Sequence, residues 1–408
     1  MNVNEIRLQF PALATRVYGK PLVYLDNAAS AQRPVSVIQE GVRLAEKANA
    51  NIHRAVHFLA GEATEAYEGT RDAVKDYLNA ASREEIVFTS GATAAINLVA
   101  FSFGEAFVHE GDEVIVSTAE HHSNIVPWQM LCQRKKAVLK VLDIQENGVL
   151  FPGDLEKRIS QRTKIVAISH ISNVLGLVNP VQDLIATSHK MGVPVLVDGA
   201  QGVVHSKVDV QELDCDFYVF SGHKVFAATG TGVLYGKKKW LDAMPPYMGG
   251  GEMIETVRFT GTTYAPLPGK FEAGTQNFNS IPTLVPALRL QHSFLNDPET
   301  IENQRAITRF VYENLTEDSR ILLYGNPKNL ENKIPLFSFA VKGAHHEDLA
   351  LILDKMGIAL RSGQMCAEPL MDRLGVTGLL RASFAPYNTL EEAEYFVKCL
   401  QKAINMLI

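Results

Sequence analysis

The sequence has few cysteines, no long apolar run and no large excess of charge of one sign. Its four cysteines, Cys132, Cys215, Cys366 and Cys399, lie far apart with no C-x-x-C pair, so neither a disulfide framework nor a metal site is predicted. No stretch of about 18 apolar residues occurs, which argues against a membrane span. The N-terminus lacks the basic and apolar blocks of a signal peptide. We therefore expect a reducing, cytoplasmic setting.

The charge balance argues against a nucleic-acid-binding protein. The formal net charge is -6 and the pI is near 6.1, and the two basic runs, 134–136 and 237–239, are short enough to be solvated faces. Hydrophobic residues make up 46% and charged residues 21% of the chain, which is ordinary globular composition. A length of 408 residues suits two domains better than one.

Short β-branched runs alternate with helical patterns over the first two-thirds of the chain. This alternation, with continuously apolar strands, predicts an α/β fold with a mostly parallel sheet covered on both faces. The expected strands are 85–89, 113–117, 138–142, 164–169, 193–198, 217–221 and 232–235, and the expected helices are 34–48, 62–79, 92–103, 124–133, 152–159 and 181–191.

The pattern changes after about residue 236. Residues 244–281 are rich in Gly, Pro and Thr and predict long ordered loops, followed by a helix over 282–294. The last hundred residues mix helices with two strands, 336–341 and 380–383, and predict a smaller α+β domain. The predicted division is an N-terminal segment, 1–20, that packs with the small domain, a large domain, 21–281, and a small C-terminal domain, 282–408, which carries Cys366.

Unusual polar residues follow several of the predicted strands. Asp198 ends VPVLVD, Lys224 follows FYVFSGH, and His121 follows EVIVSTAE. Ligands of open parallel sheets bind at the carboxyl ends of the strands, so these residues predict one shared cleft.

Lys224 and Asp198 have a chemical and a structural interpretation each. An amine at a strand end forms an imine with a carbonyl cofactor, and a carboxylate can pair with the nitrogen of a pyridine ring. The structural alternatives are a surface lysine in a turn and an aspartate that caps the next helix.

A phosphate cradle and a stacking ring are also predicted nearby. Residues 90–93 lead into a helix whose N–H groups favour a phosphate, and Ser221 and His223 could reach the same group. The ring of His121 could stack on a pyridine face. An ordinary capped helix is an equally good interpretation of 90–93, and for His122 a structural role is favoured.

The C-terminal third contributes a thiol and a guanidinium. Cys366 lies in the loop RSGQMCA, where Arg361 favours the thiolate, whereas the other three cysteines lie in or beside helix and strand patterns and are interpreted as structural. Arg381 follows a strand and could bind a substrate carboxylate with two hydrogen bonds. A surface salt bridge is the alternative for Arg381.

These residues belong to longer stretches that resemble one family. The chain is similar to cysteine desulfurases of the class V aminotransferase family, pyridoxal-phosphate (PLP) enzymes of fold type I, in their second group of SUF-type and CSD-type enzymes. The matching stretches, in family order, are YLDNAAS (24–30), NIHRAVH (51–57), TAEHHSNIVPWQ (118–129), SNVLG (172–176), VDGAQGVVH (197–205), FYVFSGHK (217–224), GTGVLYG (230–236), GGGEMI (249–254), FEAGTQN (271–277) and RASFAPYNT (381–389).

The resemblance implies a role for each matching residue. The implied roles are Lys224 as the Schiff-base lysine, Asp198 as the partner of the pyridine nitrogen, Gln201 at the phenolic oxygen, His121 on the ring face, Ala92, Thr93, Ser221 and His223 around the phosphate, Thr275 reaching the phosphate from the other subunit, Asn173 beside cofactor and substrate, Arg381 and Ala28 at the substrate, Arg361 and His53 at the entrance, and Cys366 as the nucleophile.

The implied reaction converts L-cysteine to L-alanine. Lys224 removes the α-proton and Cys366 takes the sulfur as a persulfide. A homodimer and a sulfur acceptor of the SufE/SufU or CsdE type are implied as partners, for iron–sulfur cluster assembly or another sulfur-trafficking pathway. The chain departs from the family at Met365, because the second group usually has histidine before the cysteine, and at Ala94, where Glu is usual.

Two alternatives stay open on the sequence. The first is a selenocysteine lyase, or another PLP-dependent lyase or aminotransferase of this fold, that acts on L-selenocysteine or a related substrate; only Cys366 and its surroundings distinguish it. The second is a non-catalytic partner subunit that keeps the fold, which the retention of Lys224, Asp198 and Cys366 argues against.

Overall fold

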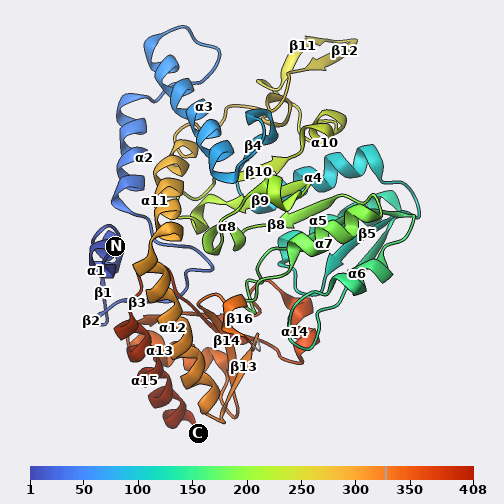
Figure 1. Cartoon of the computed structure of the whole chain (residues 1–408). Helices are drawn as coiled ribbons and strands as arrows, with labels where there is room; N and C mark the ends of the chain where they lie inside the picture. Colours follow the sequence, from blue (N-terminus) through green and yellow to red (C-terminus); the bar gives the residue numbers. More distant parts are fainter. Residues whose placement is uncertain (327–328) are drawn as a thin grey trace.

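The structure, a computed structural model, describes residues 1–326 and 329–408. A seven-stranded sheet lies at its centre in the order β4-β10-β9-β8-β7-β5-β6 (Figure 1). Its strands are β4 (Ile86–Thr89), β5 (Glu113–Ser117), β6 (Val138–Leu142), β7 (Thr163–Ser169), β8 (Val195–Asp198), β9 (Phe217–Ser221) and β10 (Gly232–Gly236).

The sheet is mostly parallel, as predicted. The run from β9 to β6 is parallel throughout, and β10 pairs antiparallel with both of its neighbours, β9 and β4. Strands β5, β8, β9 and β10 are buried along their whole length, whereas the edge strand β6 is partly exposed. Continuous burial explains why these strands read as unbroken apolar runs.

Helices cover both faces of this sheet and produce two separate apolar cores. Along β5, Ile115 packs into one core while Val114 and Val116 pack into the other, as expected when successive side chains point to opposite faces. The helices of this part are α2 (Val35–Lys47), α3 (Phe58–Leu78), α4 (Ala92–Phe107), α5 (Val126–Lys135), α6 (Pro152–Arg158), α7 (Val181–Lys190), α8 (Gly202–His205), α9 (Val210–Leu213), α10 (Lys238–Ala243) and α11 (Leu284–Asn296).

A second, four-stranded antiparallel sheet lies in the C-terminal part, in the order β13-β14-β17-β16 (Figure 1). It shares an apolar core with helices of the same part. The elements are α12 (Pro298–Glu317), β13 (Ile321–Tyr324), β14 (Leu336–Val341), α13 (His346–Lys355), β15 (Ile358–Ala359), β16 (Arg361–Gly363), α14 (Glu368–Leu374), β17 (Leu379–Ser383) and α15 (Leu390–Leu407).

The N-terminal segment contacts this C-terminal part. Helix α1 (Val3–Leu8) places Arg7 against Glu392, with a nitrogen-to-oxygen distance of 2.9 Å, and β3 (Val23–Tyr24) pairs in parallel with β15. The short strands β1 (Arg16–Val17) and β2 (Lys20–Pro21) form a small hairpin between them. The division into domains at residues 20 and 281 stays a prediction.

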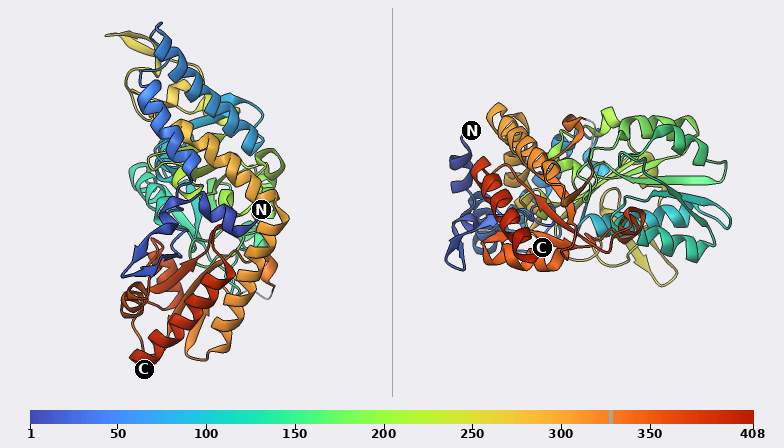
Figure 2. Two further views of the ribbon diagram at one scale, coloured as in Figure 1. Left: turned by 90° about the vertical axis from the view of Figure 1, so that its left-hand side faces the viewer. Right: turned by 90° about the horizontal axis from the view of Figure 1, so that it is seen from below.

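The sequence-based elements differ from the structure in several places, including α4, which ends at Phe107 rather than at residue 103, and the additional strands β13 and β16. Helix α3 begins at Phe58 rather than at residue 62, and residues 244–281 contain a hairpin, β11 (Ile254–Arg258) and β12 (Gly261–Tyr264), where only loops were expected. The hairpin strands are largely exposed on both faces, so their sequence lacks the alternation of apolar and polar residues by which a half-buried strand is predicted. The hairpin and the α2–α3 connection project from the same end of the molecule (Figure 2).

None of the helices in the described ranges is long and apolar enough to cross a membrane.

Candidate active site

One pocket, with a cavity of about 180 Å³, collects most of the residues singled out in the sequence. It lies where the carboxyl ends of the parallel strands meet the second sheet. The predicted residues that line it are Ala28, Ala92, Thr93, His121, Asn173, Asp198, Gln201, Ser221, His223, Lys224, Arg361, Cys366 and Arg381.

The strand ends place the amine and the carboxylate in this pocket. Asp198 is the last residue of β8, and β9 ends at Ser221 just before the turn that carries Lys224. Because β8 and β9 are parallel neighbours, both ends open at the same edge of the sheet.

Asp198 and Lys224 are both shifted toward their neutral forms. Burial raises the pKa of Asp198, which is 5% exposed, although the charge of Lys224 and the backbone N–H of Ala200, 2.9 Å away, offset part of the effect. Burial also lowers the pKa of Lys224, against the opposing charge of Asp198. A lysine that loses its proton easily is a better nucleophile toward a carbonyl carbon.

The N-terminus of α4 opens into the pocket and forms an anion cradle. Its N-cap, Gly91, has no side chain to cap the helix, and the N–H of Ala92 donates to the Ser221 hydroxyl at 2.9 Å. A Cβ at Gly232 would lie 2.3 Å from the backbone of Gly91, so only glycine lets β10 approach this turn so closely. The first-turn N–H groups of a 16-residue helix, together with the side chain of Thr93, suit a phosphate.

His121 presents a neutral ring to the pocket. Burial, and then the nearby charge of Lys224, lower the pKa of His121 to about 3. Its Nδ1 lies 2.8 Å from the hydroxyl of Ser123 and accepts from the N–H of the same residue at 3.1 Å, which fixes the orientation of the ring. A neutral, oriented imidazole is suited to stack on an aromatic cofactor.

Cys366 approaches the pocket from the loop between β16 and α14. This loop is tied to the large sheet, since Asn173 Nδ2 donates to the carbonyl of Met365 at 2.9 Å and the N–H of His122 donates to the carbonyl of Cys366 at 2.7 Å. Cys366 is partly exposed, whereas Cys132, Cys215 and Cys399 are buried.

Arg381 completes the pocket with a buried guanidinium. Its Nη1 donates to the carbonyl of Asn173 at 2.9 Å and its Nη2 contacts Asp26 at 3.2 Å. Its Nε is buried without a hydrogen-bond partner in the described part of the chain. Arg381 lines the pocket, and a guanidinium in this position is suited to bind a substrate carboxylate.

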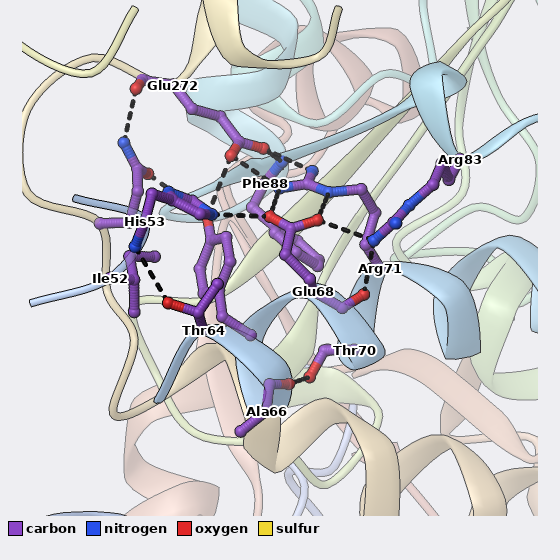
Figure 3. A network of polar contacts seen from close by, with 12 residues as sticks. Ile52, His53, Thr64, Ala66, Glu68, Thr70, Arg71, Arg83, Phe88 and Glu272 are labelled. Carbon is purple, nitrogen blue, oxygen red and sulfur yellow. Dashed lines mark hydrogen bonds and ion pairs between the residues drawn. The ribbon is translucent and has the colours of Figure 1, made fainter. Parts of the chain in front are cut away.

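Two predicted residues, His53 and Thr275, do not line this pocket. His53 instead joins a charged network, with its Nε2 3.0 Å from Glu68, and Glu68 also binds Arg71 (Figure 3). Arg71 in turn makes two hydrogen bonds with Glu272, three residues before the exposed Thr275. The network thus holds the segment that carries Thr275 beside α3 and β4.

The pocket also contains residues that the sequence analysis did not assign. Ser123 orients His121, and its signal was its place two residues after that histidine. Glu120 lies behind the pocket, where burial raises its pKa to about 7 while it accepts from Asn124 Nδ2 at 2.7 Å and from the N–H of Ser169 at 3.0 Å. The contact with Ser169 joins residues 49 apart in the sequence, so no local pattern indicates it.

The side chains fit PLP group by group. Asp198 can pair with a pyridinium nitrogen, the uncapped N-terminus of α4 can bind the phosphate, Lys224 can reach a carbonyl carbon, and His121 can cover the ring. The pKa of Asp198 is raised because the charge of Lys224 and the N–H of Ala200 offset only part of the effect of burial. A pyridinium nitrogen beside this carboxylate would supply the missing positive partner.

Comparison with known proteins agrees with this site. The model of the family described as "Aminotransferase class-V" matches residues 23–396. A protein of Cronobacter sakazakii named "Cysteine desulfurase" is 44% identical over 411 aligned residues, with 100% of this chain and 99% of the relative covered. The crystal structure of the cysteine desulfurase CsdA of Escherichia coli superposes with a TM-score of 0.91 at 38% identity, covering 100% of both chains. The apo cysteine desulfurase of Thermococcus onnurineus gives a TM-score of 0.92 at 36% identity, covering 99% of this chain and 98% of that one.

Proposed function

The chain belongs to the class V aminotransferase family, among its PLP-dependent cysteine desulfurases, and from this premise we propose that Cys366 carries the sulfur that the enzyme removes from L-cysteine. The observation that carries the proposal is the meeting of Lys224, Asp198, Arg381 and Cys366 in one pocket. A selenocysteine lyase is the less favoured function, because the relatives are named for cysteine.

Bound PLP supplies an electron sink for the charge that develops at the substrate α-carbon. Asp198 would hold its ring nitrogen, Gln201 its phenolic oxygen and His121 its ring face. Ala92, Thr93, Ser221 and His223 would surround its phosphate. These assignments rest on the positions of the side chains around the pocket.

The substrate is oriented by its carboxylate. The guanidinium of Arg381 binds it, and the amide of Asn173, the backbone near Ala28 and the guanidinium of Arg361 border the same space. Binding of the carboxylate orients the substrate so that its α-proton points toward Lys224. The Nζ of Lys224 accepts this proton as a base, because burial favours the neutral amine.

The thiolate of Cys366 then attacks the substrate sulfur. An S–S bond forms on Cys366 while the bond between the substrate's Cβ and its sulfur breaks, and the electron pair of that bond stays with the carbon. Two protons then complete L-alanine: this carbon takes one, and the α-carbon regains one from the conjugate acid of Lys224. They are the α-proton that Lys224 removed and the proton that the Cys366 thiol lost when it became the thiolate, and the persulfide stays on Cys366.

The test is a turnover assay that counts L-alanine, with and without a reductant. Cys366→Ala should keep the visible absorption band of the bound cofactor and lose persulfide and alanine by at least about 10²-fold, since the nucleophile is gone. Cys132→Ala, which removes a buried cysteine outside the pocket, is the matched control. No alanine from the wild-type enzyme under either condition contradicts the proposed function.

A homodimer is part of the same proposal. It is supported by the exposed Thr275 and by exposed apolar side chains on the α2–α3 connection and the β11–β12 hairpin, which project from the same end of the chain: Val56, Phe58, Val257 and Phe259. In a dimer, Thr275 and His53 would reach the partner's pocket. Sedimentation should give a dimer, and Phe259→Glu should weaken it.

The persulfide is proposed to pass to an acceptor protein of the SufE/SufU or CsdE type, for iron–sulfur cluster assembly or another sulfur-trafficking pathway. A reducing, cytoplasmic setting fits the four free cysteines.

A further inference from the structure

The loop that carries Cys366 has an unusual backbone. Met365 has φ 55° and Cys366 has φ 56°, so two consecutive residues with side chains occupy the left-handed region. Each such residue costs about 1 to 2 kcal/mol relative to a right-handed conformation. The loop keeps this shape only if contacts outside it hold the backbone in place.

His122 supplies two of these contacts, one on each side of the nucleophile. Its backbone N–H donates to the carbonyl of Cys366 at 2.7 Å, and its ring Nε2 accepts from the N–H of Glu368 at 3.0 Å. Glu368 is the first residue of α14, and the N-cap residue, Ala367, has no side-chain cap. The imidazole therefore caps α14 from a distant part of the chain.

A further side-chain contact from the predicted large domain reaches the residue before the nucleophile. Asn173 Nδ2 donates to the carbonyl of Met365 at 2.9 Å. Met365 is buried, and its thioether offers no strong hydrogen bond that could replace the ring contact at Glu368.

The residue before His122 is His121, which belongs to the pocket. His121 lines the pocket and faces the proposed position of the cofactor ring, and the centroids of the two imidazoles lie 6.3 Å apart. One dipeptide at the end of β5 thus touches both the ring site and the cysteine loop.

We propose that His122 is a positioning residue that sets the Cys366 thiol against the substrate bound over the cofactor. The proposal rests on the function given above. Attack on sulfur requires reacting atoms about 3 to 3.5 Å apart and aligned. If the ring of His122 releases the N–H of Glu368, the left-handed pair can relax and turn Cys366 Sγ away from that path.

The contact also fixes the tautomer. A ring nitrogen that accepts from a backbone N–H carries no proton, so the neutral ring of His122 has its hydrogen on Nδ1. A glutamine at this position can offer its Oε1 to the same N–H, whereas a phenylalanine keeps the flat shape and offers no acceptor.

The test compares His122→Phe with His122→Gln in the PLP-loaded enzyme. His122→Phe should lower kcat for L-cysteine by about 10- to 100-fold, because a displacement of about 1 Å of a reacting group has an effect of this size. KM and the change in cofactor absorption when L-cysteine is added should stay near the wild-type values. His122→Gln should recover much of kcat. His109→Phe, which changes an exposed histidine, is the matched control and should behave as wild type.

A second measurement separates this proposal from the proposed function. The rate at which iodoacetamide alkylates Cys366, followed by mass spectrometry without substrate, should change in His122→Phe and return toward wild type in His122→Gln. Equal alkylation rates and equal kcat values in His122→Phe and wild type overturn the positioning role. If His122→Phe raises KM, lowers the cofactor absorption and lowers kcat together, and His122→Gln does not restore them, the positioning role is also overturned. Such a result indicates a general structural defect. A wild-type enzyme that makes no alanine refutes the function alone, and the alkylation rates then still decide the role of His122.

Discussion

Replacing Glu272 with glutamine should weaken the fold measurably, because this carboxylate anchors the charged network of Figure 3. Glu272 accepts from Arg71 Nη1 at 2.8 Å, from Arg71 Nη2 at 2.9 Å, from the N–H of Phe88 at 2.7 Å and from the hydroxyl of Tyr67 at 3.1 Å. Arg71 is only 2% exposed. The substitution keeps the shape, removes the charge and turns an amide N–H toward a guanidinium.

The expected cost follows from the burial of Arg71. Burial lowers the pKa of Arg71, yet the charges of Glu272 and Glu68 outweigh this and raise it overall, so the guanidinium depends on both carboxylates. Breaking a buried ion pair costs about 3 to 5 kcal/mol. Because Glu68 stays in contact, the lower value, about 3 kcal/mol, is expected.

Calorimetry converts this cost into a temperature shift. For 408 residues the unfolding entropy is near 0.9 kcal/mol/K, so about 3 kcal/mol lowers Tm by about 3 to 4 °C. The matched control is Glu84→Gln, since Glu84 pairs with Lys238 at the surface and should shift Tm by about 1 °C at most. If Glu272→Gln shifts Tm no more than Glu84→Gln does, the network is not the anchor described here.

Three further substitutions have distinct expected outcomes. Asp198→Asn should lower kcat by about 10²- to 10³-fold, because a neutral amide cannot keep the ring nitrogen protonated. A kcat near the wild-type value in a turnover assay would contradict this. Arg381→Lys should raise KM for L-cysteine by at least about 10-fold, since one charged hydrogen bond to the carboxylate is worth about 1.5 to 3 kcal/mol; an unchanged KM would refute that contact. Burial lowers the pKa of Lys333 to about 7, and its Nζ donates to the carbonyl of Leu175 at 2.5 Å. Between about pH 7 and pH 10 the unfolded chain binds a proton at Lys333 that the folded chain does not, so stability should rise with pH in this window, and Lys333→Met should flatten the rise in urea midpoints.

Much of the large sheet follows from local sequence. The predicted strands 113–117 and 217–221 coincide with β5 and β9, because runs of β-branched and apolar residues buried on both faces have few other conformations. The predicted strand 138–142 coincides with the partly exposed edge strand β6. The exposed hairpin β11–β12 was missed for the converse reason, since neither of its faces carries a burial pattern.

The candidate site divides in the same way. Lys224, Asp198 and His121 follow buried strands, and the parallel order of the sheet brings their ends together. The motifs around them are those of the family to which the chain belongs. The sequence by itself therefore determined the fold class, the cofactor and many of the side chains that line the pocket.

Only the tertiary structure decided how the thiol is held. His122 and Glu368 are 246 residues apart, and Asn173 and Met365 are 192 apart, so no local pattern could pair them. The structure also placed His53 and Thr275 outside the pocket, in or beside the network of Arg71 and Glu272. Hydrogen bonds between distant segments depend on how two sheets pack against each other, and that packing is a property of the folded chain as a whole.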